Sequence, residues 1–428
     1  MRIHYKTIFQ YILIFLLISW NASGLAVGVI GKVTFDYIVM FVSLGVILLN
    51  KRCQKNILVF FAIAIMLDIL IVRYTAGGIG LDYFNHAMSG ILITYCTYYY
   101  NEDFFIHRYV RCITFFSVLS LLCWIISLVV PEIITQITFL SYIPYYNRFY
   151  ISATQYNSLP VTYHGALFYV FRTGNELTRN NGIFTEPGLY QMVLNTALYF
   201  VLFYPEKIFV SDRKKRRILG VLILTIVTAQ STTGYLSLMV LIITYLISNN
   251  VEKSNKVPLR KIIVVAVLFL IVDQAVNGMN SLLGNVISSK ITFDGGRIAF
   301  VSTGAARVDT FAIVLSSLLK HPLGAGSDLF NNMILSANKT SSDGAALMAA
   351  AAQLGIQIWV ILAAFFAYPA YKNRKSIYSY IAVVFMFINT TLGQSDIFYP
   401  ALFILSMNFG SYENNMMKGY AYEDTVDV

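Results

Sequence analysis

Apolar runs of roughly 15 to 22 residues, each bounded by polar or charged turns, recur along the chain. A run of this length can satisfy its backbone hydrogen bonds as a helix inside lipid, and a soluble domain does not carry so many. The composition agrees, because 57% of the residues are hydrophobic and 12% are charged. The sequence therefore predicts an all-α polytopic membrane protein with about twelve transmembrane helices. The runs lie at 8–20, 33–49, 57–72, 84–100, 112–130, 187–204, 218–230, 233–248, 262–277, 346–370, 377–392 and 400–411.

Lysine and arginine residues indicate how these helices are oriented. The positive-inside rule places short basic turns in the cytoplasm. The stretch 218–248 has such clusters on both sides, so we expect a hairpin of two helices there rather than one span. Both termini then fall in the cytoplasm, and the net charge of +10 reflects topology and attraction to membrane lipids, not nucleic-acid binding. The clusters lie at 51–55, 108–111, 213–217, 253–261 and 372–375.

Two long segments, 131–186 and 278–345, interrupt the short turns, and the alternation of helices places both on the extracytoplasmic side. Long loops on a rigid helical frame are common places for binding and catalysis. The predicted parts are N-terminal transmembrane helices (1–130), a first large loop (131–186), central transmembrane helices (187–277), a second large loop (278–345), C-terminal transmembrane helices (346–411) and a cytoplasmic tail (412–428).

Arginines stand out in these two loops, where the positive-inside rule does not require them. A guanidinium group forms bidentate hydrogen bonds with phosphate oxygens and keeps its charge when partly buried. The loops are therefore expected to bind an anionic ligand. The alternative is that the arginines pair with Glu176, Asp294 or Asp309 and hold the loops together. The arginines are Arg148, Arg172, Arg179, Arg297 and Arg307.

The run Arg179–Gly188 (RNNGIFTEPG) leads from the first loop directly into a predicted span. Gly182 and Gly188 allow a backbone to approach a ligand closely. A helix N-terminus beside Arg179 and Glu186 is suited to holding a phosphate and poising a base. The same residues fit a plain loop-to-helix cap in which Arg179 pairs with Glu186.

With Arg179 before it, the segment 182–188 resembles the corresponding segment of O-antigen and capsule repeat-unit polymerases of the Wzy type. Three further segments resemble that family's hairpin tip (228–234), its second-loop turn (321–326) and its re-entry into the membrane (343–356). The related O-antigen ligases usually carry a His followed by an Asn at the re-entry. This chain has Asp343 and Gly344 there, which favours a polymerase over a ligase.

The resemblance implies a GT-C-like fold in the bacterial inner membrane, with two large periplasmic loops. It implies a metal-independent glycosyltransferase with no cofactor, which transfers a glycan from undecaprenyl pyrophosphate to the non-reducing-end sugar of a lipid-linked repeat unit. A chain-length regulator and a flippase are the implied protein partners. The charge of the pyrophosphate grows as it departs, so arginines that contact it lower the barrier. The candidates are Arg179, Arg297 and Arg307, with Arg172 as a weaker one.

The general base stays open at this point. Glu186 or Asp343 is a carboxylate that can accept the acceptor hydroxyl's proton if it lies within hydrogen-bond reach. His321 is a third candidate because imidazole titrates near neutral pH, although it equally suits a helix C-terminus. Asp68 and His86 fall inside predicted spans, where ionisable groups face a cavity or a partner, and Arg73 is one possible partner of Asp68.

Two other functions compete with glycosyl transfer. A flippase or permease also needs many spans, but it binds its substrate near the membrane midplane, whereas the charged groups here gather in the outer loops. A non-catalytic scaffold predicts that the loop arginines tolerate alanine.

Overall fold

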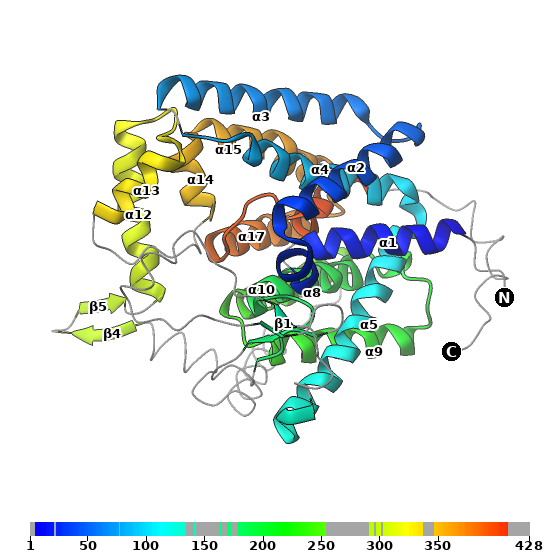
Figure 1. The fold of residues 1–428 in the computed structure, drawn as a ribbon. Helices are drawn as coiled ribbons and strands as arrows, with labels where there is room; N and C mark the ends of the chain where they lie inside the picture. The colour runs from blue at the N-terminus through cyan, green and yellow to red at the C-terminus, as the bar shows by residue number, and fades with distance from the viewer. Residues whose placement is uncertain are drawn as a thin grey trace.

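Our computed structural model describes residues 5–20, 23–76, 78–133, 141–142, 163–164, 169–172, 179–253, 291–294, 297–300, 303–336 and 346–409. Helices dominate this part of the chain (Figure 1). Short strands occur only in the two segments predicted as long loops, as far as these residues show. They are β1 (Ser141–Tyr142), β2 (Tyr163–His164) and β3 (Phe171–Arg172) in one antiparallel sheet, and β4 (Ile291–Asp294) with β5 (Arg297–Phe300) in another.

The helical frame comes from three stretches of the chain. The first holds α1 (Tyr5–Trp20), η1 (Leu25–Ile30), α2 (Lys32–Leu49), α3 (Lys55–Thr75), α4 (Leu81–Tyr100) and α5 (Glu102–Val129). The second holds α8 (Pro187–Phe203), η3 (Pro205–Lys207), α9 (Asp212–Thr228) and α10 (Thr232–Lys253). The third holds α12 (Thr303–Lys320), α13 (Gly326–Ser336), α14 (Ala346–Leu354), α15 (Gln357–Leu362), η6 (Ala363–Ala367), α16 (Tyr368–Lys372), α17 (Ile377–Gly393), α18 (Pro400–Phe403) and η7 (Ile404–Ser406).

Four helices of the described chain are long and apolar enough to cross a membrane: α2, α3, α5 and residues 232–249 of α10. Large apolar side chains are exposed on the outer faces of α2 and α3, for example Phe41, Leu48, Phe60 and Leu67. A protein in water buries continuous apolar faces of this kind, whereas lipid solvates them. The fold therefore fits a helical membrane protein.

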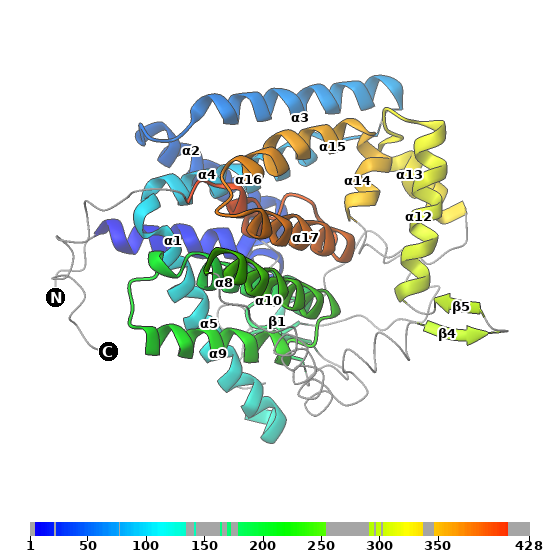
Figure 2. The same cartoon turned by 180° about the vertical axis from the view of Figure 1, so that it is seen from behind.

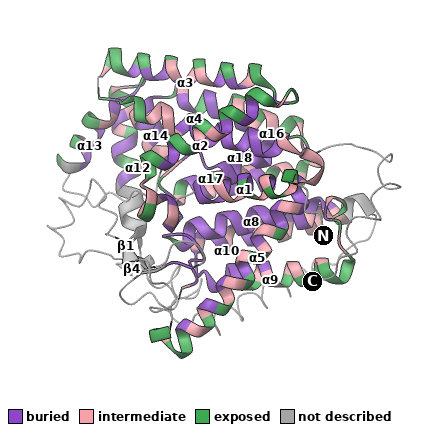
Figure 3. Ribbon diagram, turned by 45° about the vertical axis from the view of Figure 1, so that its right-hand side comes forward, coloured by how far each residue is buried: buried purple, intermediate pink, exposed green. Residues whose placement is uncertain are grey.

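The centre of the bundle is α8, in which every residue except Leu202 is buried. It contacts α5, α9, α10, α17 and α18, and Figure 3 shows it coloured as buried along its length. Its polar side chains Gln191, Asn195 and Thr196 are buried too and make hydrogen bonds within the bundle. The segment that precedes α8, which includes Arg179 and Glu186, is therefore attached to the most deeply buried helix of the frame.

Two predictions about helix boundaries have clear outcomes. The stretch 218–248 is a pair of helices, α9 and α10, joined at Ala229–Ser231, as the flanking charges predicted. The single run predicted at 346–370 is wrong, because the helix breaks after Leu354 at Gly355, whose φ is 81°. The Ile356 amide donates to the Pro322 carbonyl at 3.0 Å, so the break lets a turn of the second loop dock there. The run at 262–277 lies outside the described residues.

The prediction of a span at 400–411 is also wrong, because α18 and η7 together cover only residues 400–406. Beyond them the backbone is non-helical up to Phe409, and Met407 and Phe409 are buried in the bundle. Side chains from other elements donate to carbonyls along 400–409: Thr196 to Ala401 in α18 at 3.0 Å, Asn373 to Ser406 in η7 at 2.9 Å, and the Tyr98 hydroxyl to Asn408. Irregular backbone at membrane depth requires such burial inside protein.

Gly90 of α4 allows the loop before α18 to pack closely. A Cβ atom at Gly90 would lie 2.7 Å from the Phe398 carbonyl oxygen and 3.1 Å from the Trp20 ring. Gly90→Ala is therefore expected to destabilise the fold by about 1–3 kcal/mol, because the steric clash outweighs the higher helix propensity of alanine. Gly45→Ala in α2, where nothing lies within 4 Å, is the control and is expected to be neutral or slightly stabilising. Unfolding in detergent measures both, and equal effects would contradict this packing.

Candidate functional site

Basic side chains gather at one end of the frame, which we call the basic end. Contacts between turns define it: Asn50 donates to the Tyr99 carbonyl at 2.7 Å, and Lys375 pairs with Glu206 at 2.7 Å. Because successive helices run in opposite directions, the turns at 20–32, 179–187, 229–231 and 393–399 meet at the other end, which we call the site end (Figure 1). The cations of the basic end are Lys51, Arg52, Lys55, Arg108, Arg111, Lys207, Arg213, Lys214, Lys215, Arg216, Arg217, Lys372, Arg374 and Lys375.

At the site end, the segment that begins with Arg179 lies against the tip of the α9–α10 hairpin. Arg179 Nη2 donates to the Gln230 carbonyl at 2.7 Å, and the Asn180 amide donates to the Thr228 carbonyl at 3.0 Å. Gln230 has a φ of 50°, which a residue with a side chain seldom adopts. Such backbone is maintained only where its surroundings fix it, and it marks functional sites more often than other places. Two of the four segments that carry the resemblance are therefore in contact.

Both predicted glycines are explained by packing within the protein. Gly182 has a φ of 55°, and a Cβ atom there would lie 2.6 Å from the Tyr190 ring. A Cβ atom at Gly188 would lie 1.9 Å from Gln394 Nε2. The absence of side chains at these positions makes room for Tyr190 and Gln394, which hold the segment against α8 and against the loop after α17.

Glu186 is the N-cap residue of α8, in extended backbone, and its side chain makes no capping hydrogen bond. It is exposed, whereas the residues around it are buried. Burial, reinforced by the negative charges of Asp396 and Glu186, raises the pKa of Tyr399 well above its ordinary value. Tyr399 therefore lies within electrostatic reach of both carboxylates and connects the Arg179 segment to a second polar group.

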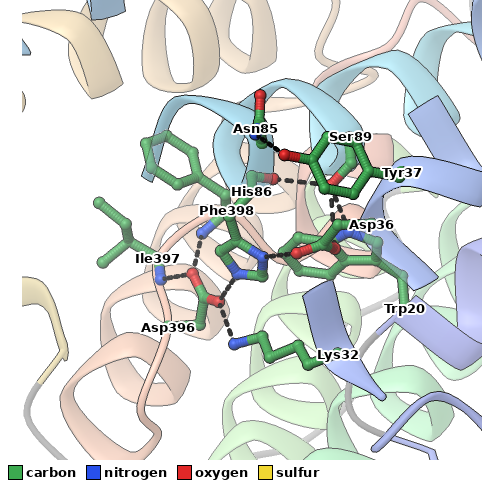
Figure 4. Close-up of polar contacts among 10 residues, drawn as sticks. All are labelled: Trp20, Lys32, Asp36, Tyr37, Asn85, His86, Ser89, Asp396, Ile397 and Phe398. Atoms are coloured by element: carbon green, nitrogen blue, oxygen red, sulfur yellow. Dashed lines mark hydrogen bonds and ion pairs between the residues drawn. The ribbon is translucent and has the colours of Figure 1, made fainter. Parts of the chain in front are cut away.

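This second group is a cluster of ionised side chains from α2, α4 and the loop after α17 (Figure 4). His86 Nδ1 lies 2.8 Å from an oxygen of Asp36, and His86 Nε2 is hydrogen-bonded to Asp396. Carboxylates only accept, so both ring nitrogens carry hydrogen and His86 is an imidazolium. Lys32 lies 3.7 Å from Asp396 and balances the second negative charge. We call these residues the Asp36–His86–Asp396 cluster.

Neighbouring groups hold the cluster in place. Trp20 stacks on the His86 ring with centroids 4.3 Å apart, and its Nε1 donates to Ser89, which donates to Asp36 at 3.1 Å. Backbone amides of residues 397 and 398 donate to Asp396 at 2.6 and 3.0 Å. Burial alone would raise the pKa of Asp396, but His86 and Lys32 hold it well below its usual range. The cluster is therefore an ordered, charge-balanced unit.

The other loop arginines are placed only by their backbones. Arg172 ends β3, two residues after Val170, whose amide donates to the Gly182 carbonyl at 2.7 Å, so its backbone lies beside the Arg179 segment. Arg297 begins β5 and is the cross-strand partner of Asp294. This register is compatible with an ion pair between Arg297 and Asp294, which was the alternative to ligand binding for Arg297. Arg307 lies in the N-terminal part of α12, while Asp343 and Arg148 lie outside the described residues.

His321 lies at the end of α12, beside the turn that packs against α14 and α15. It follows α12 directly, its amide donates to the Ser317 carbonyl at 2.7 Å, and its carbonyl accepts from Gly324 at 2.9 Å, as at a helix C-terminus. Helical rise separates it from Arg307 by about 21 Å along α12. In Figure 2, α12 runs from the β4–β5 hairpin toward the end of α3. Arg307 and His321 therefore do not contact the same diphosphate group.

Sequence reasoning missed most of the Asp36–His86–Asp396 cluster. It identified His86 as an ionisable residue in a span that needs a partner, but it did not single out Asp36, Asp396 or Lys32. The sequence did hold a hint of the cluster, because Lys32, Asp36 and Asp396 are charged residues at or near the ends of apolar runs. The pairing itself joins residues separated by 310 positions, which no local pattern reveals.

The suggested pairing of Asp68 with Arg73 is wrong. Asp68 is 2% exposed, on the face of α3 that packs into the bundle, whereas Arg73 is exposed. Five residues along a helix place two side chains on different faces.

No protein-family model, curated protein or solved structure matches the chain. In the described ranges, no group of three or more His, Cys, Asp or Glu side chains is arranged to hold a metal ion.

Proposed function

We propose that this protein is a polysaccharide polymerase of the O-antigen and capsule type. It transfers a growing glycan from undecaprenyl pyrophosphate to the non-reducing-end sugar of a lipid-linked repeat unit. The observation that carries the proposal is the contact between Arg179 and the hairpin tip at Gln230, 2.7 Å apart. These two segments resemble the polymerases independently and come from distant parts of the sequence, and the fold joins them.

Orientation supports the same function. If the basic end lies in the cytoplasm, as the positive-inside rule requires, the site end faces the opposite side of the inner membrane. Lipid-linked repeat units are polymerised on that periplasmic face. The full topology of about twelve spans with two large periplasmic loops is part of this proposal.

In the proposed reaction, the bond between the anomeric carbon of the glycan and the pyrophosphate oxygen breaks. The acceptor hydroxyl oxygen forms the new glycosidic bond, and its proton passes to a carboxylate. Glu186 suits this role because it is exposed at the start of α8, in the same segment as Arg179. Asp343 is the rival for this role. Arg179 stabilises the charge that develops on the departing lipid pyrophosphate.

The Asp36–His86–Asp396 cluster acts in this scheme as a positioning unit. It fixes the loop 394–399, and Tyr399 in that loop lies within electrostatic reach of Glu186. Lys32 is 44% exposed at its side chain and places a cation at the same end of the frame. The N-termini of α2, α4, α8 and α10 also point to that end, and their dipoles favour a negatively charged ligand.

The purified protein, incubated with lipid-linked repeat units in bilayers, tests the function. A ladder of longer glycans is the expected result. Movement of the repeat unit across vesicles without elongation would identify a flippase, which the buried charges of the Asp36–His86–Asp396 cluster also suit. Transfer to lipid A core with no ladder would identify a ligase. Either of these two results would overturn the proposal.

A further inference from the structure

Asp68 lies within α3, one of the helices able to cross a membrane, and only 2% of its surface is exposed. In the portion of the chain that the structure describes, neither of its carboxyl oxygens has a hydrogen bond of standard distance and angle, although the side-chain amide of Gln357 lies close to them. A charged carboxylate without a partner is costly inside a membrane protein, so a residue of this kind marks a functional site.

Two polar side chains from other elements lie close to Asp68. The hydroxyl of Tyr83, in α4, is within electrostatic reach of Asp68, and the side-chain amide of Gln357, in α15, is its polar neighbour. The Tyr83 hydroxyl and Gln357 Oε1 are also buried and have no partner among the described residues. Gln357 Nε2 donates to the Leu323 carbonyl at 2.8 Å. Asp68 and Gln357, from two elements, therefore present polar oxygens with unused bonding capacity to each other, and the Tyr83 hydroxyl lies in the same buried region.

We propose that Asp68 is a proton-binding site and that the folded protein holds it as a neutral carboxylic acid. A neutral carboxyl group has one O–H donor and an acceptor oxygen, whereas a carboxylate only accepts. The Asp68 O–H then donates to Gln357 Oε1, which has no donor among the described residues. One proton thus satisfies both groups, but an ionised Asp68 leaves Gln357 Oε1 without a donor.

The bound proton fastens a turn of the second loop to the frame. Gln357 contacts both Asp68 and Leu323, and the neighbouring Ile356 amide donates to Pro322 at 3.0 Å. Beyond the turn, the Ser327 amide donates to the Gly78 carbonyl at 3.3 Å, just after α3. The pair Asp68–Gln357 therefore connects α3 and α15 to the turn at 321–326. This site is separate from the Arg179 segment and does not depend on the proposed reaction.

Infrared spectroscopy of the full-length protein in bilayers at neutral pH tests the proposal. The carbonyl stretching band of a protonated carboxyl group should be present and should be lost in Asp68→Asn. Asp82→Asn is the matched control, because Asp82 is exposed at the start of α4 and its removal should leave the band unchanged. A band that persists in Asp68→Asn would overturn the proposal.

Two further measurements keep the proposal testable if Asp68→Asn does not fold. Gln357→Leu removes the acceptor of the Asp68 proton, so the band should stay but shift in frequency, and an unshifted band would contradict this hydrogen bond. Thermal unfolding of the wild type should be the same in sodium chloride and in choline chloride at equal ionic strength. A rise in Tm that depends on sodium would overturn the proposal, because it would show that a sodium ion rather than a proton binds to the same oxygens.

Discussion

Replacing Arg179 by alanine is expected to lower the rate of polymerisation by about 10²–10³-fold, the usual effect of removing one donor that stabilises developing charge. Arg179 Nη2 is held at 2.7 Å from the Gln230 carbonyl, so the guanidinium is already oriented before any ligand binds. A preorganised group of this kind acts mainly on kcat, because it binds the departing pyrophosphate more strongly than the ground state. Single-turnover assays with lipid-linked repeat units measure the effect.

Two controls separate chemistry from folding. Arg217→Ala removes an exposed arginine from the basic end and should leave the rate unchanged. Arg179→Lys keeps the charge but loses the planar fork, so it should recover only part of the rate. If Arg179→Ala unfolds at the wild-type temperature and still forms full-length glycan, the proposed role of Arg179 is wrong.

Replacing His86 by alanine is expected to destabilise the protein by about 3–5 kcal/mol, the typical cost of removing one partner from a buried ion pair. The imidazolium separates Asp36 from Asp396, whose side chains are only 9% and 12% exposed. Without it, two carboxylates face each other in a poorly solvated place. Equilibrium unfolding in detergent measures the loss.

A triple variant tests whether charge causes this loss. Adding Asp36→Asn and Asp396→Asn to His86→Ala removes the unpaired charges, so a large part of the lost stability should return. If the triple variant is less stable than His86→Ala alone, the packing of the His86 ring against Trp20 matters more than the charge balance.

The sequence predicted the helices well wherever a single local property, such as apolar length or flanking charge, determines their positions. Apolar run length located α1 to α4, and flanking charge correctly divided 218–248 into α9 and α10. It failed where other parts of the chain decide. The break at Gly355 exists because a loop turn docks there, and the helix that starts at Pro400 ends by Ser406, where Asn373 and Tyr98 donate to the Ser406 and Asn408 carbonyls. Hydropathy does not contain those contacts.

The candidate site was predictable only in part. Motif order led to Arg179 and Glu186, and the structure places their segment beside the hairpin tip at Gln230. The same reasoning named His321 as a third candidate that also suited a helix C-terminus, and the structure places it at the C-terminal end of α12. The pairing of His86 with Asp36 and Asp396 depends on helix packing between three distant parts of the chain.

A structure of the protein in bilayers with an undecaprenyl-pyrophosphate-linked repeat unit tests the central claim most directly. We expect density for the diphosphate at the site end, with its oxygens about 3 Å from the guanidinium of Arg179. A diphosphate bound at the basic end, or away from both Arg179 and the hairpin tip, would contradict the proposed function.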